Sequence, residues 1–267
     1  MSNLFRRVVE LYADKKQFGG DFTIYFDVPF DDGDDANVAE IKIYNLTTQS
    51  INEIKKGSKI ILNAGYSGDA GSILLGEAQT VKTEWERVDK ITTITVLDGS
   101  ESWLKMPIKK TYKEGIKAKQ ILNDILAITG LEIGAVNLPT NKVYKGGKTI
   151  NTTLQKAIAQ IAKDCGAKTH VNRGKIFIRP KNEGDNIGFV LDAEHGLISS
   201  PMPIEKEDKQ KNIIKGFKVV SLLNHRIATD SLLQIKSKTA NGIFRVESGK
   251  HYANGRAFYT EMECYPI

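Results

Sequence analysis

The feature that most constrains the fold is a change of hydrophobic period along the chain. From Phe22 to Val28 apolar and polar residues alternate, which is the period of two that a half-buried strand requires. From Lys117 to Thr129, and again from Leu154 to Cys165, the apolar residues recur at helical spacing instead. From Asn186 onward the chain returns to short strand patterns. The sequence therefore predicts a mainly β fold with an α+β middle.

The predicted elements divide the chain into three domains. Residues 1–107 contain short strand patterns separated by glycine turns, which favours a β-barrel. Residues 108–185 form a small α/β module, and residues 186–267 form a second β-barrel domain. In this last domain the highly charged stretch from Ile204 to Asn212 predicts a loop.

Local signals mark the ends of the two helices in the module. Gly130 is placed to end the first helix as a left-handed cap. Thr152 and Gln155 form a capping-box pattern at the start of the second helix, and Gly166 ends it. Two short strand patterns follow, joined at Asn172-Arg173-Gly174, and they predict a hairpin.

The net charge of +6 is unevenly distributed. Residues 1–100 carry a net charge of −5, residues 101–185 carry +9 and residues 186–267 carry +2. The basic residues of the middle segment are nearly all lysines that are scattered rather than interleaved with aromatic residues, so base stacking and bidentate base contacts are poorly provided for. We therefore expect no specific nucleic-acid binding, and a positive module that docks on an acidic neighbour.

Composition excludes several classes of protein. No stretch approaches the roughly eighteen apolar residues of a membrane span, and the charged start of the chain is not a secretory signal. Cys165 and Cys264 are too sparse for a disulfide framework or a CxxC metal site. We expect free core thiols in a chain that folds in the cytosol, with no membrane partner.

Two passages resemble ligand-binding loops without completing the motif. Gly147-Lys148-Thr149 matches the end of a phosphate-binding loop, but Lys142 stands where its first glycine belongs. Pro29 ends the first predicted strand inside an acidic stretch, Asp27 to Asp35, that has oxygen ligands for calcium without the spacing of an EF-hand. We predict a flexible lysine-rich loop and a solvated acidic loop, with no cofactor and no metal.

A third passage offers groups for acid–base or metal chemistry. Asp192, Glu194 and His195 supply two carboxylates and an imidazole, and Ser199 and Ser200 follow closely. None of them stands in a nucleophile-elbow or zinc-helix pattern. We predict a structural turn.

The remaining candidates are single residues or distant pairs. Cys165 and His170 suggest a thiol nucleophile with its base, but Cys165 completes the apolar stripe of a predicted helix, where a thiol is inert. No pair among the acidic residues is marked as a glycosidase pair. We predict no catalytic residue, and structural roles for His225, His251, Trp85 and Trp103, the two tryptophans in the core.

Several passages resemble one known family. Near the N-terminus these are Ala39–Thr47, Ile54–Tyr66 and Leu75–Glu77, and Leu154–Pro180 resembles the middle module of the same family. The stronger match is a closing set: Gly196–Pro201, Gly216–Asn224, Ser237, Gly242–Val246, His251 and Phe258–Glu261. The family is that of baseplate hub proteins of bacteriophages and of phage-tail-like particles such as tailocins.

The resemblance implies a structural, non-enzymatic hub. Its subunits form a homotrimer in which each chain has two tail-tube-like barrel domains, so that the ring joins the sixfold tail tube to the threefold central spike. The implied partners are the tail tube or distal tail protein, the central spike protein, and the baseplate wedge and tape-measure proteins. The implied location is the tail baseplate of a virion, assembled in the cytoplasm of the bacterial host.

The chain also departs from the family pattern. Asn224-His225-Arg226 and Ala228-Thr229-Asp230 stand where a proline after the asparagine and a Pro-Gly turn are expected, so we expect a different turn there. We expect no appended lysozyme, peptidase or peptidoglycan-binding segment, and therefore no wall digestion by this subunit. The alternative that stays open is a tail-tip enzyme or wall-binding module that acts on cell-surface glycan.

Overall fold

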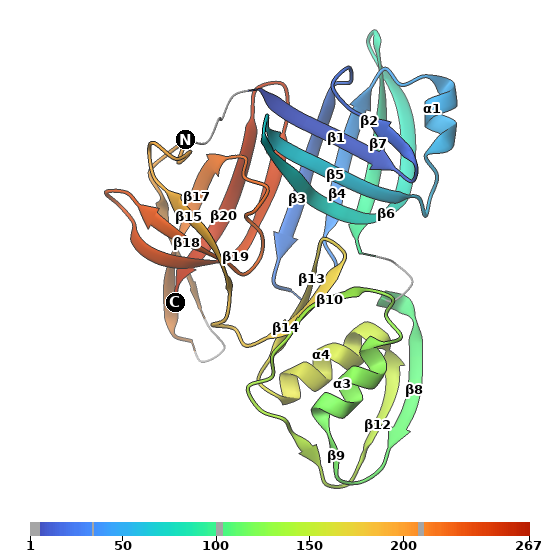
Figure 1. Cartoon of the computed structure of the whole chain (residues 1–267), viewed down its shortest axis with the longest axis vertical. Coiled ribbons are helices and arrows are strands. Elements are labelled where there is room, and N and C mark those ends of the chain that lie inside the picture. The colour runs from blue at the N-terminus through green and yellow to red at the C-terminus, as the bar shows by residue number, and fades with distance from the viewer. Residues whose placement is uncertain (1–5, 34, 100–103, 208–210) are drawn as a thin grey trace. The chain divides into compact units, whose positions relative to one another are not determined.

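The computed structural model describes residues 6–33, 35–99, 104–207 and 211–267. It divides into two compact units (Figure 1). The first, here called the β unit, takes in residues 1–31, 37–97 and 184–267; the second, here called the inserted module, takes in residues 32–36 and 98–183. Strands predominate, and the helical content is concentrated in the module, which confirms the mainly β fold with an α+β middle. The proposal that residues 1–107 and 186–267 are separate barrel domains stays a prediction.

The N-terminal half of the β unit is a run of antiparallel strands with one short helix. Ile24, Phe26 and Val28 are buried on one face, as their alternation predicted. The prediction that Pro29 ends this strand was wrong, because the strand continues to Asp31 and pairs with another strand throughout. The elements of this half are β1 (Arg7–Ala13), β2 (Lys16–Phe18), β3 (Ile24–Asp31), β4 (Val38–Tyr44), α1 (Thr48–Glu53), β5 (Lys59–Tyr66), β6 (Asp69–Glu86) and β7 (Asp89–Asp98).

The C-terminal half of the β unit is also built of strands. The prediction of a loop from Ile204 to Asn212 was wrong for its first part, because Met202–Glu207 is a strand that pairs along its whole length with the next one. Residues 208–210 of that stretch lie outside the described residues. The strands of this half are β15 (Asp185–Leu191), β16 (Met202–Glu207), β17 (Ile213–Leu222), β18 (Ser231–Lys236), β19 (Asn241–Ala253) and β20 (Phe258–Pro266).

The two halves share one thirteen-stranded sheet because β19 pairs with β3. The pairing is antiparallel and places His251 opposite Val28. A glycine is required beside this join: a Cβ at Gly249 would lie 2.3 Å from the carbonyl oxygen of Glu261 and 2.7 Å from the ring of Phe30. At Gly249 the backbone of β19 therefore has no room for a side chain between β3 and β20.

Each half has its own hydrophobic core, and each core borrows side chains from the other half. Leu223, Ala253 and Phe258 of the C-terminal half pack into the core of the N-terminal half. In return, Phe30 of β3 packs into the core of the C-terminal half. This exchange of apolar side chains stabilises the join in addition to its backbone hydrogen bonds.

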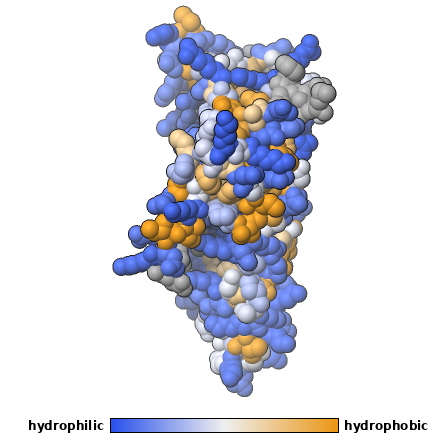
Figure 2. Space-filling view, turned by 90° about the vertical axis from the view of Figure 1, so that its left-hand side faces the viewer, coloured by the Kyte–Doolittle hydropathy of each residue, from blue (hydrophilic) through white to orange (hydrophobic). Residues whose placement is uncertain are grey.

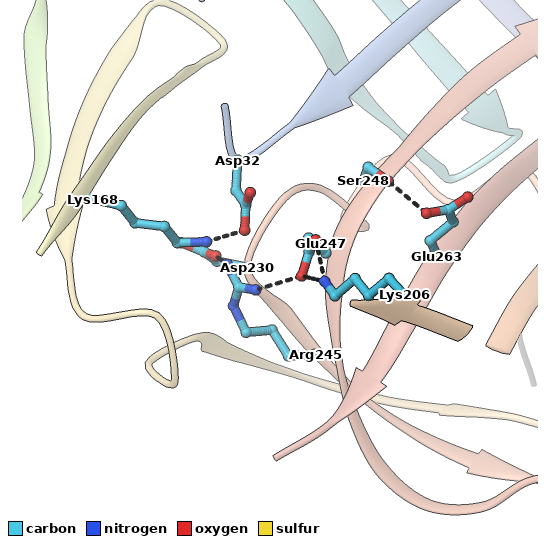
Figure 3. A network of polar contacts seen from close by, with 8 residues as sticks. All are labelled: Asp32, Lys168, Lys206, Asp230, Arg245, Glu247, Ser248 and Glu263. Atoms are coloured by element: carbon cyan, nitrogen blue, oxygen red, sulfur yellow. Dashed lines mark hydrogen bonds and ion pairs between the residues drawn. The ribbon is translucent and has the colours of Figure 1, made fainter. Parts of the chain in front are cut away.

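A chain of charged side chains in the C-terminal half leads from a buried pair to a partly exposed one (Figure 3). Asp230 is fully buried and forms an ion pair with Arg245, and Arg245 in turn lies 4.0 Å from Glu247, which pairs with Lys206. Asp230 has a φ of 68°, in the left-handed region. A residue other than glycine therefore occupies a backbone conformation that glycine adopts more readily.

The inserted module packs two helices against short strands. Its buried core includes the predicted apolar stripes of both helices. Among the residues that the structure describes, no helix is long and apolar enough to cross a membrane. The elements of the module are β8 (Pro107–Tyr112), β9 (Ile116–Lys117), α3 (Ala118–Leu126), β10 (Glu132–Val136), β11 (Val143–Tyr144), β12 (Lys148–Thr153), α4 (Leu154–Asp164), β13 (Lys168–Asn172) and β14 (Lys175–Arg179).

Two of the predicted boundaries in the module are confirmed. Gly166, with a φ of 77°, directly follows the C-cap of α4 as predicted, and Arg173 and Gly174 form the turn of the β13–β14 hairpin. The prediction that Gly130 caps the first helix was wrong, because α3 ends at Leu126 with Ala127 as its C-cap. The predicted capping box at Thr152 was wrong. The N-cap of α4 is Thr153, and its side chain makes no capping hydrogen bond.

Acidic residues tie two further segments into the module. Asp32 pairs with Lys168 of β13 (Figure 3). Asp98 accepts hydrogen bonds from the backbone N–H groups of Arg173 and Gly174, both at 3.1 Å. Burial raises the pKa of Asp98 to about 6 and lowers the pKa of Arg173 to about 10. The turn of the hairpin is thus held by a carboxylate that burial makes costly to ionise.

Candidate functional site

A shallow groove of about 260 Å³ crosses β3, β4 and β19, where the two halves of the β unit join. Successive residues of a strand face opposite sides of a sheet. Tyr25 and Asp27 therefore project into the groove from β3, while Ile24 on the opposite face is buried in the core. Tyr44 enters from β4 and Tyr252 from β19. The groove is the candidate functional site of the β unit.

Each tyrosine that lines the groove has an edge-to-face partner, which for Tyr252 is Tyr259 outside the groove. The rings of Tyr25 and Tyr44 have centroids 5.1 Å apart, and the rings of Tyr252 and Tyr259 have centroids 5.7 Å apart. Burial raises the pKa of Tyr44 and of Tyr252, so both phenols stay protonated at neutral pH. The groove therefore offers aromatic faces together with hydroxyl groups that donate and accept hydrogen bonds.

The charges in and beside the groove balance one another. Lys250 Nζ donates to Asp27 Oδ2 at 2.7 Å, and this hydrogen bond raises the pKa of Lys250. Lys42 Nζ lies 3.1 Å from Glu40 Oε1. Such a surface suits a neutral or mixed-charge partner, and tyrosine is enriched where proteins bind one another. The groove can bind such a partner through stacking on its tyrosine rings and hydrogen bonds to its polar groups.

The lysine-rich loop that resembled a phosphate-binding loop is a turn between two short strands. Gly147 has a φ of 77°, and a Cβ there would lie 2.6 Å from the carbonyl oxygen of Tyr112. Lys148 begins β12 and lies 3.5 Å from Asp164.

The carboxylates of the acidic stretch point to different partners. Asp27 pairs with Lys250 and Asp32 with Lys168, and Asp35 accepts from Gln155 Nε2 at 3.4 Å. Asp34 lies outside the described residues. In the ranges that the structure describes, no group of three or more His, Cys, Asp or Glu side chains is arranged to hold a metal ion.

Asp192 and His195 form an exposed turn. Asp192 Oδ1 accepts from the backbone N–H groups of Glu194 and His195 at 3.0 and 2.9 Å, and it lies 2.6 Å from His195 Nδ1. The hydrogen bond with His195 lowers the pKa of Asp192. Ser199 and Ser200 are exposed and belong to the loop that follows.

Both cysteines are free and buried, as predicted. Cys165 closes α4 inside the core of the module, and Cys264 lies in the core of the C-terminal half of the β unit. Burial raises the pKa of the Cys264 thiol, which keeps it protonated and unreactive. His170 stacks on Phe177, with ring centroids 5.1 Å apart.

The other two histidines contact residues far away in the sequence. His251 is buried, with Nδ1 2.9 Å from Thr260 Oγ1 and Nε2 3.1 Å from the carbonyl oxygen of Ile227. His225 covers Gly71 of β6, where a Cβ would lie 2.4 Å from the imidazole ring. Both side chains thus pack within the β unit.

The prediction that Trp85 is a core residue was wrong, because its side chain is 72% exposed. β6 pairs with β5 only as far as Glu77, so its last residues extend beyond that partner with β7 alone. Trp85 lies near the end of this hairpin, with Lys90 Nζ 5.9 Å from its ring centroid. Trp103 lies outside the described residues.

Comparison with known proteins shows which solved structures share this architecture. No family model and no curated protein matches the chain, but solved structures do. A tail protein from Neisseria meningitidis has a TM-score of 0.70 at 10% identity, covering 98% of this chain and 97% of that one. The 43 kDa tail protein of prophage MuSo2 from Shewanella oneidensis has a TM-score of 0.69 at 9% identity, covering 97% and 98%. The chain has the fold of phage tail proteins.

The same tail-protein fold occurs in a secretion machine. The E. coli c3393 protein is a component of the type VI secretion system that exhibits structural similarity to the T4 bacteriophage tail proteins gp27 and gp5. It has a TM-score of 0.67 at 9% identity, covering 96% of this chain and 76% of that one. The expected fold is thereby confirmed.

The groove of this tail-protein fold was not predicted from the sequence. Tyr25 and Tyr44 stand in clear strand patterns, but Tyr252 lies more than two hundred residues further on. Only the pairing of β3 with β19, which places Tyr252 opposite Asp27, brings the three rings together. No local signal in the sequence indicates that pairing.

Proposed function

We propose that this chain is a structural subunit of a tail or baseplate hub. Three copies form a closed ring that joins the sixfold tail tube to the threefold central spike, and the ring has no catalytic turnover. Its partners are the tube or distal tail protein, the spike, and the wedge and tape-measure proteins. The ring belongs to the baseplate of a virion or tail-like particle and assembles in the bacterial cytoplasm.

One observation carries the proposal: a tail-protein fold in which two β halves share a single sheet through β3 and β19. If each half is a tube-like domain, three chains present six such domains, which matches a sixfold tube while the ring itself stays threefold. The path of the sheet ends at β16 on one side and β2 on the other. Edge strands of this kind have free backbone groups that a neighbouring subunit can pair.

The surface supports a role in assembly. The face drawn in Figure 2 is mainly hydrophilic with separate apolar patches. Exposed apolar residues of the β unit include Ile213, Ile243 and Ile267, each more than half exposed. Burial of such side chains against a neighbouring subunit is the usual source of stability in a permanent oligomer.

The test is the solution mass of the purified chain, measured by light scattering after size exclusion over a range of concentrations. Three times 29.6 kDa is about 89 kDa, and a stable species of that mass supports the ring. Electron micrographs of the same fraction are expected to show threefold symmetry. A stable dimer would count against the hub, and so would a monomer that fails to form rings when tube protein is added.

The second candidate function, binding of cell-surface glycan, is favoured by the tyrosine groove alone. Aromatic faces with hydroxyl and carboxylate neighbours also suit sugar rings. Sedimentation with purified cell walls distinguishes the two functions: a glycan-binding module sediments and loses this property in Tyr252→Ala. The matched control is Tyr12→Ala on β1, outside the groove.

A further inference from the structure

One end of the inserted module gathers lysine side chains around two short paired strands. β9 pairs with β11, so that Lys117 lies opposite Val143. Next to this pair, the backbone N–H of Ala118 donates to the carbonyl oxygen of Lys142 at 2.8 Å. Two separate stretches of chain thus contribute to one cluster, here called the lysine tip: Lys113, Lys117, Lys119, Lys142, Lys145 and Lys148.

The six lysines of the tip outnumber the carboxylates beside them, which are Glu114, next to Lys113, and Asp164. Lys142 and Lys148 share one carboxylate, Asp164, at 3.6 and 3.5 Å. Across the described ranges the other four lysines of the tip form no ion pair, and all four are exposed. Because like charges repel, this arrangement raises the free energy of the folded state unless an anion is bound.

A helix end adds to the same positive field. α3 begins at Ala118, and its first turn contains no acidic residue. The N-terminus of a helix has a partial positive charge, which acidic side chains usually offset. Here Lys117 and Lys119 flank it instead. The lysines and the helix dipole therefore both favour a negatively charged ligand at this end of the module.

The side chains around the tip favour a protein ligand over a nucleic acid. The two arginines of residues 101–185, Arg173 and Arg179, lie in the β13–β14 hairpin rather than in the tip. Tyr144 is 7% exposed and donates its hydroxyl to Asp164, so its ring is not available for stacking on a base. Val143, in contrast, is 46% exposed among the lysines and offers an apolar contact.

We infer that the lysine tip docks a carboxylate-rich segment of a partner protein. The flexible ammonium groups pair with carboxylates, and Val143 packs against an apolar residue between them. The inference extends the proposed function. It rests on that function only in stating that the partner is a tail component. The surface itself can be tested without the partner.

The experiment measures binding of a fluorescently labelled deca-glutamate peptide to the full chain by anisotropy at low salt. The test variant is the triple substitution Lys113→Glu, Lys117→Glu and Lys145→Glu. The matched control is Lys55→Glu, Lys59→Glu and Lys82→Glu, three exposed lysines of the β unit that change the net charge equally. A DNA duplex of similar charge is titrated in parallel, and circular dichroism checks that both variants fold.

We expect the tip variant to bind the peptide roughly tenfold or more weakly than the natural chain, and the control to bind within about twofold of it. Equal losses in the two variants would overturn the inference, because net charge would then explain the binding. Tighter binding of the duplex than of the peptide, or no binding of the peptide at low salt, would also overturn it. If the chain forms a trimer but does not bind the peptide, the hub proposal is supported and the docking surface is overturned. If the chain stays a monomer but binds the peptide, the docking surface is supported and the hub proposal is overturned.

Discussion

A buried ion pair of the β unit and an exposed ion pair of the inserted module show two different uses of charge. In the β unit the pair formed by Arg245 and Asp230 is almost completely buried, with side chains 7% and 0% exposed. In the module the pair formed by Lys110 and Asp124 is 42% and 41% exposed, and the lysine tip is hardly paired. A buried pair fixes the geometry of the chain, whereas exposed charges remain available to a partner. The Arg245–Asp230 pair therefore fixes the fold, whereas the charges of the lysine tip can contact a partner.

The two units also differ in the distance along the chain that their contacts span. The module's helices and strands pack within the segment 98–183, together with the short segment 32–36. The β unit depends on β3 and β19, where Asp27 and Lys250 are 223 residues apart. We therefore expect substitutions in the module to act locally and substitutions in the β unit to act on the whole unit.

The largest loss is expected from Asp230→Ala. The substitution removes the closest carboxylate from buried Arg245 and also forces alanine into a left-handed φ, at a cost of about 3–5 kcal/mol. Urea unfolding followed by circular dichroism measures the change. Asp230→Asn is the control for the backbone, because asparagine tolerates this φ but lacks the charge. A loss below about 1 kcal/mol in Asp230→Ala would show that the pair behaves like a surface pair.

Ile158→Ala is expected to destabilise the module by about 2–5 kcal/mol, because Ile158 is 1% exposed in its core. The module should then unfold before the β unit, giving two transitions. Hydrogen exchange read by mass spectrometry assigns each transition to its segment. The matched variant Ile94→Ala, fully buried in the β unit, should weaken the other transition. A single transition shared by both variants would contradict the separation of the two units.

Asp98 gives the module an unusual dependence on pH. Its pKa is raised from 3.8 to about 6 in the folded state, so between these values the folded chain binds more protons than the unfolded chain. The contribution of Asp98 to stability is therefore full below pH 3.8 and falls, by about 3 kcal/mol, as the pH rises to about 6. Unfolding in urea over a pH series is expected to show a flatter profile for Asp98→Asn.

Asp124 provides the opposite control for this pH series. The hydrogen bond from Lys110 lowers the pKa of Asp124, so its contribution is present above its unfolded pKa and is lost as the pH falls. The natural chain should lose stability at acid pH as Asp124 is protonated, and Asp124→Asn should not show this part of the loss. Identical pH profiles for Asp98→Asn and the natural chain would contradict the role of Asp98.

The smallest effect is expected from Lys110→Ala. Exposed ion pairs contribute about 0.2–1 kcal/mol, and this pair is about two-fifths exposed on both sides. Unfolding in urea at low and high salt measures it, and the difference between the natural chain and the variant should shrink as salt screens the pair. A loss as large as that of Asp230→Ala would remove the contrast between the two units.

The sequence allowed prediction of elements whose signal is local. The helices of the module were found because each has a stripe of apolar residues at helical spacing, and α4 is also stopped by Gly166, which has a positive φ. The end of α3 was placed too late, because the helix ends at Leu126, before Gly130. The start of α4 was missed by one residue because Thr152 and Thr153 are both able to cap a helix. β16 was missed because Glu205 and Glu207 leave an edge strand as polar as a loop.

Features that depend on distant pairing had no such signal. Trp85 is exposed because β6 extends beyond the end of its partner β5. The tyrosine groove forms because β3 pairs with β19. The burial of Asp230 likewise depends on Arg245, which lies on another strand. In each case the residue type is visible in the sequence, but its neighbour is decided by strand order.

The pairing of β3 with β19 also determines how late during synthesis of the chain the sheet can be completed. The two strands are separated by 223 residues at Asp27 and Lys250, which a ribosome translates in a time on the order of tens of seconds. Throughout that interval the edge of β3 has no β19 to pair with, and Phe30 lacks the core that later buries it. A chaperone or a second nascent chain on the same messenger can cover this edge first. Slower translation of the segment between the two strands lengthens the time in which chains can associate wrongly.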